Sequence, residues 1–177
     1  KHNVIQGMMS VNLSASGSLI DLGGGVGSVA AGAVQFFPGW EASVLEPSRK
    51  AIKAGKKAFP EITFICGSLS REVNLPNKEY DLAIISMVFH YIDRSLLSKA
   101  ISNIDNLVKP GGHIVIQDFY TPTPKANKYH HDKEIYIYKQ DYSLPFKALN
   151  TYTEIYSKSG ETNHTKFDEN DLYDTWL

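Results

Sequence analysis

LIDLGGGVG, residues 19–27, is an apolar strand that runs directly into a turn with four glycines. Small residues follow from Ser28 to Val34, as expected for a helix that starts at the turn. Glycine allows backbone angles that other residues resist, and it lets a ligand approach the main chain closely. The start of a helix presents unpaired N–H groups and the positive end of its dipole. The sequence therefore predicts a strand, a turn and a helix, with a ligand site at the turn.

An acidic residue lies where a ribose contact is expected. Glu46 closes a second apolar run, residues 40–45, and follows Gly27 by nineteen positions. This spacing suits a carboxylate at the end of the neighbouring strand, where it accepts hydrogen bonds from both hydroxyls of a ribose. We therefore predict a nucleoside site.

Two kinds of nucleoside cofactor fit this turn. Residues 25–30 match the dinucleotide pattern G-x-G-x-x-A, so NAD or FAD is one candidate. Asp21 favours the other candidate, because a carboxylate just before the glycines repels a pyrophosphate and attracts an ammonium group. S-adenosylmethionine carries an ammonium and a sulfonium group and has no phosphate.

Four motifs in series resemble the class I S-adenosylmethionine-dependent methyltransferases. Glu46, the predicted ribose contact, is one of these motifs. Residues 80–92 resemble the family's fourth strand and the turn after it. Residues 107–118, with the sequence LVKPGGHIVIQD, resemble the helix, turn and strand that lead into the fifth. The match covers residues 18–118 in the right order. The family's first motif, (D/E)-x-G-x-G-x-G, is matched by Asp21, Gly23, Gly25 and Gly27.

The resemblance implies an α/β, Rossmann-like three-layer sandwich with helices on both faces of a mostly parallel seven-stranded sheet. Its strand order is 3-2-1-4-5-7-6. The last strand is antiparallel, and in this sequence it can be incomplete. Apolar runs that alternate with helical patterns predict strands at 18–22, 41–46, 62–66, 80–86 and 112–118 and helices at 27–37, 48–58 and 94–108. We expect two further strands, at 152–156 and from residue 172 onward.

The length of 177 residues predicts a single methyltransferase domain, residues 1–177. We divide it into an N-terminal segment (1–17), a cofactor-binding core (18–118), an insertion that could cap the substrate (119–151) and a C-terminal hairpin (152–177). Because the sequence begins without Met and ends in an apolar-aromatic stretch, we expect that it is trimmed from a longer chain or lacks a segment.

The resemblance also implies the cofactor contacts. Asp21 and the turn glycines would hold the methionine portion of S-adenosylmethionine, and Glu46 with Pro47 would lie at the ribose. The remaining contacts would be those of Gly67, Ser68 and Leu69 with adenine and of the backbone at Ser86 and Met87 with the ammonium group.

The candidates for catalysis follow the fourth and fifth strands. His90 lies near the expected methyl group and is either a general base or a hydrogen-bonded structural residue. Asp118 and Tyr120 close the fifth strand and could orient the substrate. His130-His131 lacks a third ligand at a suitable spacing, so no metal site is predicted. Eight of the ten tyrosines line an acceptor pocket or simply pack: Tyr120, Tyr129, Tyr136, Tyr138, Tyr142, Tyr152, Tyr156 and Tyr173.

The composition of the chain opposes some classes of function and location. The formal charge of −1 opposes tight binding to nucleic acid, which favours a basic surface. A single cysteine, Cys66, fits a reducing compartment, and we expect it to be a small buried side chain on its strand. Neither a signal peptide nor a membrane span is evident, so the expected location is cytoplasmic.

We therefore predict direct in-line transfer of a methyl group from S-adenosylmethionine to N, O or C of a small molecule, leaving S-adenosylhomocysteine. The chain contains neither (D/N)-P-P-(Y/F) nor a Pro-Cys nucleophile, which opposes the usual base- and amide-methylating chemistries. An NAD(P)-dependent oxidoreductase and a non-catalytic scaffold with this fold remain the alternatives. No oligomeric state is predicted.

Overall fold

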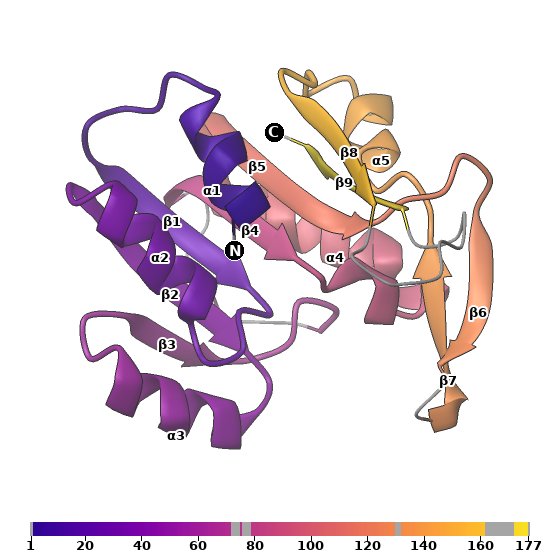
Figure 1. The fold of residues 1–177 in the computed structure, drawn as a ribbon, viewed down its shortest axis with the longest axis horizontal. Helices are drawn as coiled ribbons and strands as arrows, with labels where there is room; N and C mark the ends of the chain where they lie inside the picture. Colours follow the sequence, from indigo (N-terminus) through magenta and orange to yellow (C-terminus); the bar gives the residue numbers. More distant parts are fainter. Residues whose placement is uncertain (1, 72–74, 76–78, 130–131, 162–171, 177) are drawn as a thin grey trace.

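A computed structural model describes residues 2–71, 75, 79–129, 132–161 and 172–176 (Figure 1). Its main sheet has the order β3-β2-β1-β4-β5-β9-β8, in which β1 to β5 are parallel and β9 runs antiparallel between β5 and β8. This order confirms the expected one. The strands are β1 (Gly17–Leu22), β2 (Trp40–Glu46), β3 (Thr63–Cys66), β4 (Tyr80–Ser86), β5 (Val108–Phe119), β8 (Ser157–Glu161) and β9 (Leu172–Trp176).

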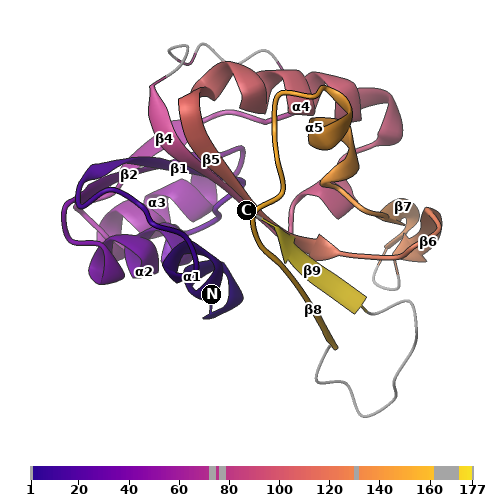
Figure 2. The ribbon, with the colours of Figure 1, turned by 90° about the horizontal axis from the view of Figure 1, so that it is seen from above.

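Helices cover both faces of the sheet (Figure 2). Ser48 caps the helix at residues 49–58, because its side-chain oxygen accepts the N–H of Ala51 at 3.2 Å. Asp93 caps the helix at residues 94–107 in the same way. One face carries α1 (His2–Met9), α2 (Ser28–Phe36) and α3 (Arg49–Ala58), and the other carries α4 (Arg94–Leu107) and α5 (Leu144–Ala148).

Successive residues of the central strands supply two separate cores. In β4, Leu82 and Ile84 pack toward α1 and α2, while Ala83 and Ile85 pack toward α4. Burial on both faces is typical of parallel strands, and each buried Leu or Ile contributes about 1.5–3 kcal/mol. The sheet is therefore a rigid platform for the loops at its carboxyl edge.

The segment after β5 forms a second, two-stranded sheet that stands apart from the main one (Figure 1). Its strands, β6 (Lys125–Tyr129) and β7 (Asp132–Lys139), pair antiparallel. The hairpin packs beside the short helix η1 (Phe89–Tyr91), which follows β4. Segments far apart in sequence thus meet at the carboxyl end of β4.

Two sequence predictions are wrong. Residues 152–156 form no strand, and the strand begins at Ser157. The alternation there arises because Tyr152 packs against Phe146 and donates to Asp105 at 2.8 Å. Cys66 is exposed rather than buried, because it ends β3, a strand at the edge of the sheet.

Candidate active site

The glycine turn after β1 has the backbone that its sequence predicts. Gly23, Gly25 and Gly27 have φ of 76°, 59° and 82°, a left-handed conformation that side chains disfavour. A Cβ on Gly25 would meet no described atom within 4 Å, so the space above the turn is open. The turn therefore forms a cradle whose floor is main chain.

Asp21 lies beneath this turn. Its side chain is 1% exposed, and a Cβ on Gly24 would come within 2.6 Å of its carboxyl group. Among the described residues its Oδ2 has no hydrogen-bond partner. Burial and, to a smaller extent, nearby Glu46 raise the pKa of Asp21 to about 7, although a backbone hydrogen bond from Ala30 opposes them. A cation above the turn would stabilise this isolated carboxylate.

Glu46 is fixed at the rim of the cradle. One carboxylate oxygen accepts the N–H of Gly25 at 3.0 Å and the other accepts the N–H of Ser48 at 2.8 Å. The side chain is 8% exposed, and Pro47 beside it is exposed. Each oxygen retains a second acceptor position, as two ribose hydroxyls require.

The segment predicted to contact adenine lies next to Glu46. Gly67 donates its N–H to the main-chain oxygen of Glu46 at 3.2 Å, because β3 pairs with β2. The Ser68 and Ser70 hydroxyls are 3.1 Å apart. Leu69, in contrast, is buried in the core on the α4 side.

The turn after β4 packs directly on the glycine turn. A Cβ on Gly23 would lie 2.7 Å from Cγ2 of Val88, so only glycine leaves room for this contact. Met87 has a φ of 59°, and its N–H donates to the Gln117 carbonyl at 2.7 Å. The Ser86 hydroxyl lies 3.4 Å from the Gln117 side chain. Adjacent strands therefore bring Ser86 and Met87 to the edge where the cradle opens.

Sequence analysis did not single out Val88 or Gln117. No local signal marks Val88, because its role depends on a contact with another turn. Gln117 could have been found by aligning β4 with β5, since it is paired with Ser86.

His90 and Asp118 form a buried pair. Nδ1 of His90 lies 2.6 Å from Oδ1 of Asp118, and the residues are 1% and 0% exposed. Because a carboxylate can only accept, Nδ1 donates, and neutral His90 carries its basic lone pair on Nε2. This arrangement is the one that orients a general base in many enzymes.

Asp118 also organises the backbone around His90. Its oxygens accept the main-chain N–H groups of Val88 at 3.1 Å, of His90 at 3.4 Å and of Phe119 at 2.7 Å. The hydrogen-bond partners of Asp118 are thus groups of the protein, and Asp118 can act on a substrate only indirectly, through His90. Tyr120, the third candidate, lies partly buried against the core.

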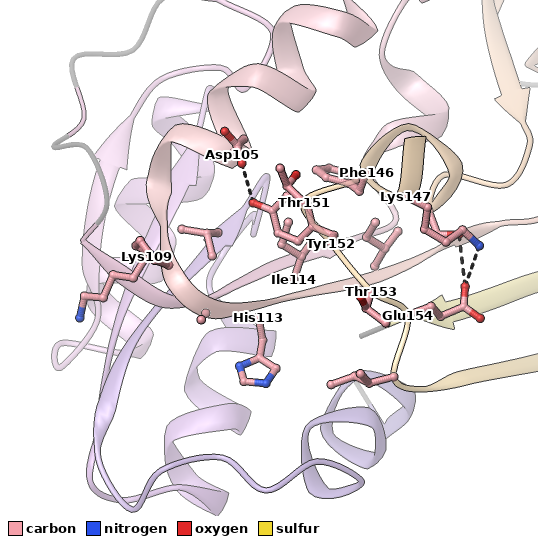
Figure 3. A pocket seen from close by; sticks show the side chains of 17 residues that line it. Asp105, Lys109, His113, Ile114, Phe146, Lys147, Thr151, Tyr152, Thr153 and Glu154 are labelled. Carbon is pink, nitrogen blue, oxygen red and sulfur yellow. Dashed lines mark hydrogen bonds and ion pairs between the residues drawn. The ribbon is translucent and has the colours of Figure 1, made fainter. Parts of the chain in front are cut away.

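A cavity of about 610 Å³ lies elsewhere, between β5, α5 and residues 151–155 (Figure 3). Four of its polar side chains form two pairs: Tyr152 with Asp105, and Lys147 with Glu154 at 2.9 Å. None of the residues predicted to bind the cofactor or to act in catalysis lines it, and of the eight candidate acceptor-pocket tyrosines it is lined by Tyr152. We therefore place the site at the glycine turn and not in this cavity.

Within the described ranges, no group of three His, Cys, Asp or Glu could hold a metal ion. In that same part of the chain, every helix is too short or too polar to cross a membrane.

Comparisons with known proteins agree with this geometry. The chain is 29% identical over 119 residues to the demethylmenaquinone methyltransferase of Chlamydia felis. The alignment covers 66% of this chain and 50% of that protein. It is 29% identical over 79 residues to an uncharacterised methyltransferase of Synechocystis, which covers 45% of this chain and 37% of that protein. The chain thus spans half or less of the length of these curated relatives.

Solved structures share the fold at low sequence identity. The Burkholderia thailandensis 1,6-didemethyltoxoflavin-N1-methyltransferase, with bound 1,6-didemethyltoxoflavin and S-adenosylhomocysteine, is 14% identical with a TM-score of 0.71, covering 91% of this chain and 69% of that one. The glycopeptide N-methyltransferase MtfA, in complex with S-adenosylmethionine, is 13% identical with a TM-score of 0.70, covering 98% and 92%.

The strand order of the main sheet is thus one found in solved methyltransferase structures. A family model for an O-methyltransferase domain matches residues 3–160, and the chain belongs to that family.

Proposed function

We propose that this domain binds S-adenosylmethionine at the glycine turn and transfers its methyl group to an oxygen of a small molecule. The observation that carries the proposal is the packing of Val88 on Gly23. This contact joins the cradle to the turn that bears His90, so we expect a ligand in the cradle to lie near this buried, oriented imidazole.

The residues present fit the cofactor. The open space over Gly25 admits a ligand against the main chain, and Glu46 offers both oxygens to a ribose. The unpartnered oxygen of Asp21 lies beneath the turn, where an ammonium group would stabilise the ionised carboxylate and a pyrophosphate would oppose it. Gly67 and Ser68 follow β3 beside Glu46, as an adenine contact requires, and Ser86 ends β4 and Met87 follows it at the same edge of the sheet.

When bound, S-adenosylmethionine supplies a methyl group made electrophilic by a positive sulfur, which leaves as the thioether. His90 takes the proton of the acceptor hydroxyl on Nε2 as the oxygen forms its bond to carbon. Asp118 holds the imidazole in the required orientation and stabilises the imidazolium that results. Alignment of the acceptor and exclusion of water contribute the rest.

The strand order disfavours the dinucleotide alternative. In the usual dinucleotide-binding order, 3-2-1-4-5-6, the fifth strand is followed by a parallel sixth. Here β9 is antiparallel and lies between β5 and β8, and the family match is to methyltransferases.

Oxygen is the favoured acceptor because the matching family model is an O-methyltransferase domain and because a hydroxyl must lose a proton to a base such as His90. Nitrogen is the second candidate. Two structures with this fold are N-methyltransferases, and an amine that is already neutral needs no base at the transition state.

The test combines binding and turnover. Titration of S-adenosylhomocysteine into the protein should release heat with micromolar affinity, and Glu46→Ala should weaken binding at least 10-fold. Methyl-labelled S-adenosylmethionine offered with a panel of phenols, alcohols and amines should label a phenol or alcohol. Absence of binding by the folded protein overturns the proposal. Binding without turnover supports the scaffold alternative instead, and labelled amines alone would reassign the acceptor to nitrogen.

A further inference from the structure

The turn that carries His90 is weakly held by its own backbone. Met87 has a φ of 59°, in the left-handed region that side chains disfavour, and such a conformation persists only where the surrounding structure enforces it. The helix η1 is a single 3₁₀ turn, closed by the bond from the N–H of Ile92 to the Phe89 carbonyl at 2.9 Å. The position of His90 therefore depends on tertiary contacts of this turn.

Asp118 supplies some of these contacts from β5, and a second set comes from the segment that follows β7. The Tyr142 ring stacks on the ring of Phe89, the first residue of η1, with centroids 5.0 Å apart and 15° between the planes. Both residues are buried, at 2% and 1% exposure. Phe146 of α5 also packs on Phe89, with ring centroids 6.4 Å apart. Aromatic pairs attract each other beyond the effect of the area that they bury, so the stack ties η1 to this segment.

Tyr142 is itself fixed by contacts of β7. Its hydroxyl donates to the main-chain oxygen of Tyr138, a residue of β7, at 2.7 Å. Arg94, which begins α4, lies over the Tyr138 ring at 6.0 Å and donates to the Gln140 side chain at 3.2 Å. The end of β7 is thus attached to the chain before His90, at Phe89, and after it, at Arg94.

We propose that Tyr142 is a positioning residue, whose ring, stacked on Phe89, holds η1 where His90 reaches Asp118. Tyr142 acts on the reaction only through η1, because its ring and its hydroxyl both have partners within the protein. The segment of residues 119–151 thereby serves as a support for the proposed base. This inference rests on the proposed function, in which His90 takes the proton of the acceptor.

The bond between His90 and Asp118 is the direct readout, and it needs no acceptor. A proton held between Nδ1 and a carboxylate exchanges slowly and gives a far-downfield NMR signal, which is assigned by its loss in His90→Asn. Tyr142→Leu should abolish this signal, because η1 relaxes without the stack, whereas Tyr142→Phe keeps the ring and should retain it. Phe89→Leu removes the same stack from the other side and should behave like Tyr142→Leu. Since the two changes remove one interaction, their effects on stability should not add.

Tyr152→Leu is the matched control. The Tyr152 ring also packs on Phe146, with centroids 5.5 Å apart, and its hydroxyl donates to Asp105 of α4 at 2.8 Å. Its loss should destabilise the protein much as the loss of Tyr142 does. The His90 signal should nevertheless remain, because these contacts are with α5 and α4 and not with η1.

Turnover gives the second readout, with the acceptor that the panel above identifies. Tyr142→Leu should lower kcat by about 10²-fold, as a misplacement of about 1 Å does, and leave S-adenosylhomocysteine affinity unchanged. Tyr142→Phe and Tyr152→Leu should keep nearly the kcat of the wild type.

Retention of the downfield signal in folded Tyr142→Leu or Phe89→Leu overturns this inference. Loss of the signal in Tyr152→Leu, or its absence from the wild type, does so as well, and none of these results bears on cofactor binding. Failure of the wild type to bind S-adenosylhomocysteine overturns the proposed function and, with it, the role of Tyr142 in the reaction.

Discussion

Nδ1 of His90 and Oδ1 of Asp118 are 2.6 Å apart, although 28 residues separate them in the chain. The same carboxylate accepts three main-chain N–H groups, from Val88, His90 and Phe119. Asp118 therefore fixes both the imidazole and the turn on which it stands. A change at this residue should affect stability and activity together.

Asp118→Asn should lower the free energy of unfolding by about 2–4 kcal/mol. An amide has one acceptor oxygen in place of two, and hydrogen bonds to a charged group are worth about 1.5–3 kcal/mol each. Urea denaturation measures the loss. Asp93→Asn is the control, because this exposed cap of α4 tolerates asparagine and should leave the stability nearly unchanged. Equal stability of the two variants would contradict the assignment.

His90→Asn separates the base from its structural role. The asparagine amide can donate to Asp118 in place of Nδ1, but it has nothing at the position of Nε2. We expect kcat to fall by about 10²–10⁴, as for loss of a general base, with S-adenosylhomocysteine affinity unchanged. An acceptor with a more acidic hydroxyl should lose less, since it needs less help to release its proton. A kcat within twofold of the wild type would leave His90 a structural residue.

The conformation of the glycine turn could be predicted from the sequence because its parts are local. The strand, the glycine turn and α2 are consecutive, and the left-handed φ at Gly23, Gly25 and Gly27 explains the motif. The strand order was implied by the family resemblance, whereas the alternating patterns predicted the strands themselves and the helices α2, α3 and α4.

The rest depended on tertiary contacts. The pairing of His90 with Asp118 requires the register of β4 on β5, and the stacking of Tyr142 on Phe89 requires the position of a separate segment. The alternation in residues 152–156 suggested a strand, because the sequence alone does not distinguish an aromatic side chain that packs on a helix from one that faces the core from a strand. The exposure of Cys66 follows from the edge position of β3, which local pattern does not reveal.

Asp21 should make stability depend on pH with an unusual sign. Its pKa is about 7 in the folded protein, against an ordinary value of 3.8 for an unfolded chain, so the folded state keeps a proton that the unfolded state has lost. The contribution of Asp21 is therefore intact below pH 4 and is lost as the pH rises through 7. Asp21→Asn should stabilise the protein at pH 8 by up to about 4 kcal/mol and make little difference at pH 4.

Asp81→Asn is the control with the opposite sign. Burial opposes the ionised form of Asp81, but hydrogen bonds from Ser18 and Lys109 outweigh it and hold its pKa below the ordinary value. Its loss should destabilise the protein above pH 4. Denaturation curves at pH 4, 6 and 8 compare both variants with the wild type. A parallel pH dependence for Asp21→Asn and wild type would show that Asp21 is not an isolated buried carboxyl.

Gly25→Ala and Gly111→Ala should separate backbone strain from loss of the cradle. Both glycines have left-handed φ, 59° and 78°, and a Cβ at either would meet no described atom within 4 Å. Each alanine should therefore cost a similar amount of stability, about 1–2 kcal/mol, from the left-handed backbone alone. Only Gly25 lies in the turn beside Glu46, so only its methyl group would occupy the space that we assign to the cofactor. Calorimetry should show S-adenosylhomocysteine binding at least 10-fold weaker in Gly25→Ala and unchanged in Gly111→Ala. If the two variants bound equally well, the open space over the turn would not be the cofactor site.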